Sequence, residues 1–221
     1  MRIGLFATSL SLILVLSFAP PAERVGVEGP PAGTWQLDPA RSVVQFTVTK
    51  LGFEDVTGRF LDFAGSVRYD AANPADSSVE WSVKIASVKT DARNRDRALQ
   101  SVEYFDAARY PEMTFRSDRV RPLGNGRLQV EGPITIRGQS RPLSIVAEPV
   151  DGGFESRFEL NRYDFGIVGG SMMGRLIGQT IRVRLVAVAA ERPRPERGAS
   201  GKSAAGGPPS ERQRGWDPAS M

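Results

Sequence analysis

Two arginine–aspartate pairs, Arg95-Asp96 and Arg162-Asp164, are the side chains best placed by type and spacing to do polar chemistry. The chain has no histidine and no cysteine, so the commonest general base, the commonest transition-metal ligand and any thiol nucleophile are missing. Ser-His-Asp hydrolases, Cys-His enzymes and the usual His/Cys zinc sites are therefore excluded. A carboxylate base, Asp96 or Asp164, is the catalytic alternative that remains. The other interpretation of each pair, which we favour over a ligand contact, is a structural salt bridge that pins a helix or loop.

The elements that would position these pairs are strands. Side chains alternate between apolar and polar with a period of two in eight runs, which predicts strands with one buried face. These runs cover 44–48, 61–69, 79–85, 113–115, 128–136, 143–147, 154–160 and 181–187. Glycine-containing segments at 124–126, 138–139 and 151–153 predict tight hairpins between neighbouring runs.

One segment departs from this alternation. Residues 91–102 (DARNRDRALQSV) are rich in helix formers, and Asp91 is a suitable N-cap. We therefore expect one short helix in a long crossover between strands.

Eight antiparallel strands with one apolar face bury it by closing into a barrel or by stacking as a sandwich. Gly65 and Gly132 lie inside strand patterns, where glycine permits the sharp coiling of a barrel wall. The fold class that we predict is all-β, an eight-stranded antiparallel up-and-down barrel with one helical crossover, and a sandwich is the alternative. Such an interior is just wide enough for one small ligand.

The ends of the chain differ in composition from this core. Residues 1–22 combine Arg2, an apolar run and Pro20-Pro21, which predicts a secretory signal or an N-terminal anchor and a location in the periplasm or cell envelope. Residues 23–32 are a Gly/Pro linker, 33–190 form the barrel, and 191–221 are a basic Pro/Arg/Gly tail expected to be disordered.

The formal net charge is +4, but part of the surplus falls in the tail and at Arg2. Because the barrel itself is nearly balanced, we expect no nucleic-acid partner. The N-terminal segment or the basic tail would at most touch a membrane surface weakly, and a homodimer is compatible with the sequence.

Six motifs follow one another through the core. They are 34–42 (TWQLDPARS), 46–52 (FTVTKLG) with 56–60 (VTGRF), 88–90 (VKT) with 95–99 (RDRAL), 105–107 (FDA) with 110–115 (YPEMTF), 132–138 (GPITIRG) and 162–166 (RYDFG). In this order and spacing they resemble the YceI-like, polyisoprenoid-binding, lipocalin-like family. The chain departs from the family pattern at Arg41, Lys50 and Ala98, where histidine is usual, so any role of those imidazoles is absent or changed here.

The resemblance implies a barrel whose lumen holds a polyisoprenoid or similar amphiphilic chain, such as an isoprenoid quinone or a fatty-acid derivative, with no further cofactor. The lumen residues that we predict are Phe46, Val48, Phe63, Val67, Trp81, Val83, Phe115, Ile134, Ile136, Phe158, Phe165 and Val183. Arg95, Asp96, Arg162 and Asp164 are the candidates for polar contacts at its mouth. The alternatives are an envelope interaction or stress protein with a packed barrel and no ligand, and a carboxylate-dependent enzyme. We expect no enzyme activity.

Overall fold

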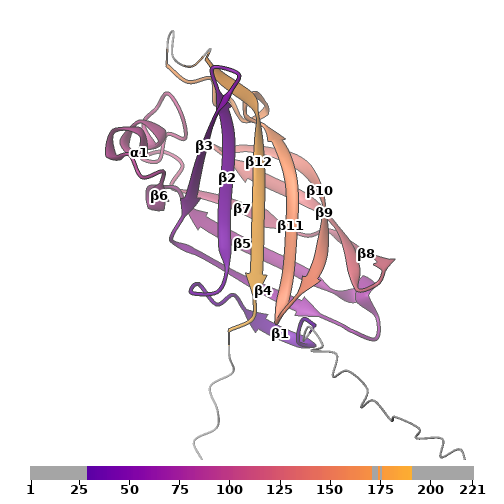
Figure 1. Cartoon of the computed structure of the whole chain (residues 1–221). Coiled ribbons are helices and arrows are strands. Elements are labelled where there is room, and N and C mark those ends of the chain that lie inside the picture. The colour runs from indigo at the N-terminus through magenta and orange to yellow at the C-terminus, as the bar shows by residue number, and fades with distance from the viewer. Residues whose placement is uncertain (1–28, 171–173, 175, 191–221) are drawn as a thin grey trace, which may run out of the picture. The chain divides into compact units, whose positions relative to one another are not determined.

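The computed structural model describes residues 29–170, 174 and 176–190, so the segments predicted as signal or anchor (1–22), most of the linker and the tail (191–221) lie outside the described residues. The described part contains twelve strands, one α-helix and three 3-10 turns (Figure 1). The strands are β1 (Gly33–Gln36), β2 (Val43–Lys50), β3 (Glu54–Phe60), β4 (Phe63–Tyr69), β5 (Ser78–Lys84), β6 (Val88–Lys89), β7 (Glu112–Arg116), β8 (Arg119–Gly124), β9 (Arg127–Ile136), β10 (Gln139–Val150), β11 (Gly153–Asn161) and β12 (Ile177–Val188). The helix is α1 (Arg93–Gln100), and the turns are η1 (Pro74–Asp76), η2 (Ile85–Ser87) and η3 (Arg162–Phe165).

All strand pairings in the described residues are antiparallel, and they join the strands into one curled sheet whose order runs from β1 to β6, with β8 added beside β9. β4 pairs with β5, β5 with β7, and β7 with β9. The sheet then continues through β10, β11, β12 and β2 to β3. β3 pairs with β6, which continues β5 beyond η2. The predicted all-β, antiparallel, barrel-like fold class is therefore confirmed, with the sheet curled into a half-barrel.

The number of strands differs from the prediction of eight because the alternation gave no run for β1, β3, β6 or β8. A corner at residues 61–62 separates β3 from β4, and η2 separates β5 from β6. β1 pairs with β4 and β8 pairs with β9 as short additions. Leu61, expected on the apolar face, sits at that corner and is 55% exposed. Local alternation could not reveal the corner, because it depends on where the sheet must bend.

The glycines inside strands have a specific physical role. A Cβ on Gly65 would lie 2.7 Å from the carbonyl oxygen of Glu80 and 2.9 Å from the Cβ of Trp81. A Cβ on Gly132 would overlap the carbonyl oxygen of Arg116. Backbone therefore approaches backbone at both positions, which only glycine allows.

The helix is shorter than predicted and begins differently. Asp91 is not the N-cap: Ala92 holds that position, and Asp91 has a left-handed φ of 60°. Asp91 therefore turns the chain between β6 and the helix. α1 lies beside the end of the sheet nearest the β2–β3 hairpin (Figure 1), in the crossover from β6 to β7 as expected.

Candidate functional site

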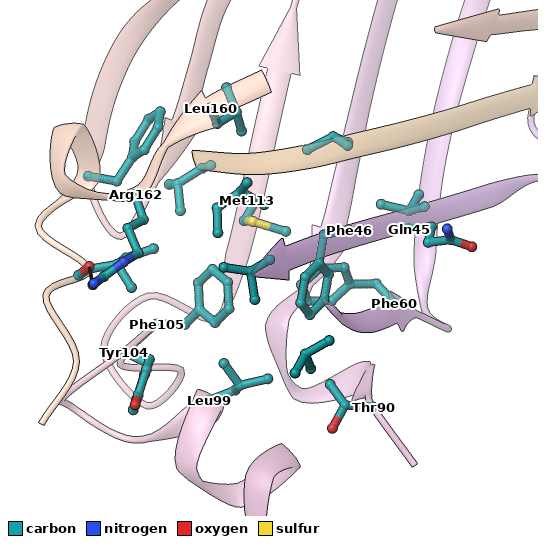
Figure 2. A pocket seen from close by; sticks show the side chains of 18 of the residues that line it. Gln45, Phe46, Phe60, Thr90, Leu99, Tyr104, Phe105, Met113, Leu160 and Arg162 are labelled. Atoms are coloured by element: carbon teal, nitrogen blue, oxygen red, sulfur yellow. Dashed lines mark hydrogen bonds between the residues drawn. The ribbon is translucent and has the colours of Figure 1, made fainter. Parts of the chain in front are cut away.

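A cavity of about 340 Å³ lies inside the curled sheet, between the strands and the crossover that contains α1. Aromatic and aliphatic side chains from both sides point into it (Figure 2). Its wall is Val44, Gln45, Phe46, Val48, Lys50, Val56, Phe60, Trp81, Thr90, Arg95, Ala98, Leu99, Tyr104, Phe105, Met113, Ile134, Ile136, Phe158, Leu160, Arg162, Phe165, Ile167, Ile177, Ile181 and Val183. Nineteen of these 25 side chains are apolar, so the space favours hydrocarbon over water.

The exposure of the strand residues indicates a hollow interior at this level. Phe46, Phe158, Leu160 and Val183 are only partly buried, although they line the cavity. A solid core of apolar residues would bury them almost completely.

Eight of the twelve predicted lumen residues line this cavity. They are Phe46, Val48, Trp81, Ile134, Ile136, Phe158, Phe165 and Val183. Val67 and Phe115 line a second, smaller cavity of about 60 Å³. The structure places Phe63 and Val83 elsewhere: they pair across β4 and β5 in the packed core, with 8% and 1% of their surface exposed. Phe63 begins β4 directly after the corner at residues 61–62, and Val83 lies near the end of β5, just before η2.

The crossover supplies a wall that strand periodicity could not reveal. Leu99, Tyr104 and Phe105 face the strands across the cavity. The ring of Phe105 meets Phe60 edge to face, with centroids 6.0 Å apart, and Phe60 lies 5.6 Å from Phe46. Phe105 in the 105–107 motif was the available signal, but the alternation covered only strands. The helix and its loop therefore close one side of the cavity.

The two residues of the first charged pair have different positions. Arg95 is exposed and lines the cavity, which places an opening beside α1. Its Nε donates to the hydroxyl of Thr90 at 2.7 Å and its Nη2 to the carbonyl of Thr90. Asp96 is buried and does not contribute to the cavity wall. The prediction of a polar contact at the mouth therefore has a structural basis for Arg95 and not for Asp96.

The second pair is also separated. Arg162 lines the cavity but is 3% exposed, and it donates to the carbonyls of Ile167, Gly174, Ile177 and Gly178 at 2.6–3.0 Å. These bonds tie η3 to the loop that follows it and to the start of β12, and they leave little of the guanidinium for a ligand. Asp164 is exposed and lies outside the cavity wall.

The charged groups in the wall are all cationic: Lys50, Arg95 and Arg162. Lys50 is paired with Glu54 at 3.4 Å, whereas no carboxylate in the described residues lies within salt-bridge distance of Arg95. Arg95 is therefore the charge at the opening that is most available to an anionic group.

The resolved pKa shifts lie outside the cavity. Hydrogen bonds from Arg184 lower the pKa of Glu155, and hydrogen bonds from Thr49 and Arg182 lower that of Asp55. Neither carboxylate is part of the cavity wall. Among residues 29–170, 174 and 176–190, three or more His, Cys, Asp or Glu side chains nowhere gather to hold a metal ion. In the same residues no helix is both long and apolar enough to cross a bilayer.

Comparison with known sequences identifies the fold family. The family model described as "YceI-like domain" matches residues 35–189. The chain belongs to the YceI-like family. A UPF0312 protein of Vibrio parahaemolyticus is 32% identical over 185 residues, which cover 77% of this chain and 93% of that protein. A UPF0312 protein of Vibrio cholerae is also 32% identical, over 76% of this chain and 89% of its own length.

Solved structures share the YceI-like fold. BcnA of Burkholderia cenocepacia matches with a TM-score of 0.65 at 23% identity, over 70% of this chain and 99% of its own. A polyisoprenoid binding domain from Saccharophagus degradans, implicated in plant cell wall breakdown, matches with a TM-score of 0.54 at 15% identity, over 72% and 100%. Both likenesses are evidence of the fold.

Proposed function

We propose that this YceI-like protein is an exported lipid-binding protein that holds the apolar chain of an amphiphile in its large cavity. The observation that carries the proposal is the cavity of about 340 Å³ with a predominantly apolar wall. Small-molecule sites typically measure about 300–1,000 Å³ and combine an apolar lining with a few polar groups. The polyisoprenoid binding domain from Saccharophagus degradans shares the fold, which supports an isoprenoid or similar chain as the ligand class.

The energetics favour a hydrocarbon tail. Transfer of apolar groups from water gains about 0.8 kcal/mol per buried CH₂. A tail of about a dozen carbons therefore gains roughly 10 kcal/mol before the cost of association is subtracted. The wall needs no specific contact to bind such a tail, so selection rests on the polar group at the opening.

The polar end of the ligand lies at Arg95 in this proposal. Thr90 holds Arg95 in a fixed position at the opening, and no described carboxylate lies within salt-bridge distance of its guanidinium. A carboxylate or phosphate head is therefore favoured over a neutral head. Among the ligand classes considered, a fatty-acid derivative or a prenyl chain with an acidic head fits better than a quinone.

The two alternatives are less well supported. A packed interaction protein would have no cavity of this size, and the partly exposed inner residues argue against it. A carboxylate enzyme would require an acid facing the cavity. Asp96 is bonded to Thr90, and Asp164 is exposed outside the wall. We therefore favour a non-catalytic binding protein of the periplasm or cell envelope.

Organic extraction of the purified full chain, followed by mass spectrometry, tests the proposal. We expect an amphiphile with one apolar chain in the extract, and uptake of dodecanoate by the extracted protein with one molecule bound per chain. A protein that yields no lipid and binds neither dodecanoate nor a prenyl phosphate would contradict the proposal.

A further inference from the structure

Two cavities in the described part of the barrel meet at one side chain. The larger, of about 340 Å³, and the smaller, of about 60 Å³, share Trp81 as a wall residue. Phe115 lines only the smaller one. The indole therefore stands between the opening near α1 and the far end of the barrel.

Packing holds this indole in place. Trp81 on β5 pairs with Phe115 on β7, and the rings are stacked with centroids 5.7 Å apart and planes inclined at 21°. On its other side β5 pairs Trp81 with Gly65, where a Cβ would lie 2.9 Å from that of Trp81. Phe115 is only 2% exposed, so the pair cannot shift toward the far end without displacing the core.

We infer that the Trp81–Phe115 pair is the floor of the lipid site and sets the length of the tail that it accepts. The inference rests on the proposed function and adds a substrate class to it: an amphiphile with a short chain. A methylene group is about the size of a water molecule, whose share of liquid volume is about 30 Å³. The large cavity therefore accommodates about a dozen carbons, and a chain of twenty or more would have to leave the cavity or displace Trp81.

The test is a length series of straight-chain carboxylates, from about eight to about eighteen carbons, with affinity measured by displacement of a fluorescent lipid from the full chain. For the wild type we expect affinity to rise to about twelve carbons and then to fall about fivefold by about sixteen, because the longer chain displaces the head from Arg95. Trp81→Ala joins the two cavities, so its optimum is expected to move to longer chains by about four carbons or more. Trp81→Leu serves as a second variant that retains more of the packing.

Phe154→Ala is the matched control. Phe154 lines only the smaller cavity, so this variant enlarges that cavity by removing an aromatic ring but leaves the floor intact. Its optimum is expected to stay near twelve carbons. Circular dichroism establishes that each variant is folded before its affinities are compared.

The possible results separate the two proposals. A longer optimal chain length in both Trp81 variants, with that of Phe154→Ala unchanged, supports the inference that the Trp81–Phe115 pair limits the length of the bound chain. Tight binding of long and short chains alike by the wild type, or an equal shift of the optimal chain length in Phe154→Ala, overturns this inference. Either result leaves the proposal of lipid binding intact. Binding of no chain of any length overturns the proposed function itself.

Discussion

The carboxylate of Asp96 accepts two hydrogen bonds from Thr90, one from its backbone N–H at 2.8 Å and one from its hydroxyl at 2.6 Å. Asp96 is 6% exposed and Thr90 is 3% exposed. Arg95 donates to the same threonine from the solvent side. Thr90 thus connects the first turn of α1 to the end of β6, and it fixes both the crossover wall and the cation at the opening.

We predict that Asp96→Ala destabilises the protein by about 2–3 kcal/mol, because it leaves two buried donors of Thr90 without a partner. The free energy of unfolding in urea measures this. Asp164→Ala is the control and is expected to change stability by less than about 0.5 kcal/mol, since Asp164 is exposed. Equal stability of the two variants would refute the structural role assigned to Asp96.

Arg95→Gln is expected to weaken binding of dodecanoate about fivefold, because it removes a charge worth about 1 kcal/mol to an anionic head near the surface. Binding of dodecanol should change less than twofold. The ratio of the two dissociation constants, measured by displacement, is the readout. Arg93→Gln is the control, since Arg93 is exposed on the same helix and outside the cavity wall. Equal losses for the acid and the alcohol would show that Arg95 does not recognise charge.

Arg162→Lys is expected to lower the free energy of unfolding by about 3 kcal/mol or more. The single ammonium group of lysine cannot donate hydrogen bonds to all four carbonyls that the planar guanidinium reaches. For a domain of this size, that loss corresponds to a melting temperature lower by about 6–12 °C. Differential scanning calorimetry measures it. An unchanged melting temperature together with weaker lipid binding would instead indicate that Arg162 serves the ligand.

Acid stability depends in part on Glu155. Its side chain accepts from Arg184 at 2.9 and 3.2 Å, and these hydrogen bonds lower the pKa of Glu155 below its ordinary value of 4.5. A lowered pKa in the folded state means that the pair stabilises the protein above about pH 4.5, and that this stability is lost as the pH falls through the folded-state value.

Glu155→Gln removes the stabilisation that the ionised carboxylate provides. At about pH 7 the variant should be less stable than the wild type by up to about 1 kcal/mol, and the difference should shrink toward zero at about pH 3. Urea unfolding at both pH values measures it. A difference of the same size at both would mean that the carboxylate charge is not the cause.

The strand wall of the site could be predicted from sequence, and the reason is geometric. Alternation assigns each strand residue to one face, so Phe46, Phe158 and Val183 were placed inward from their neighbours alone. Alternation carries no information on where along the barrel the core is solid. Phe63 was therefore predicted to line a cavity that the structure places farther along the barrel.

The polar part of the site was less predictable because neighbouring residues on a helix point in different directions. Consecutive side chains are about 100° apart around an α-helix, so Arg95 and Asp96 cannot share one role at the mouth. Their sequence proximity suggested a pair, whereas the structure buries one and exposes the other. Likewise, the wall formed by Leu99 and Phe105 depends on how the crossover docks on the sheet, which is a contact between distant segments.

The central claim is that the large cavity is where the tail binds, and filling that cavity tests it most directly. Val183 lines the cavity on β12 and is partly exposed to it, so Val183→Phe places a ring in the empty space without removing any contact. The measurement is the dissociation constant of dodecanoate for this variant and for the wild type, with Val146→Phe on the exposed outer face of β10 as control. We predict at least tenfold weaker binding by Val183→Phe with the fold preserved, and a change of less than twofold for the control. Equal affinity of Val183→Phe and wild type would contradict the account, because the tail would then bind elsewhere.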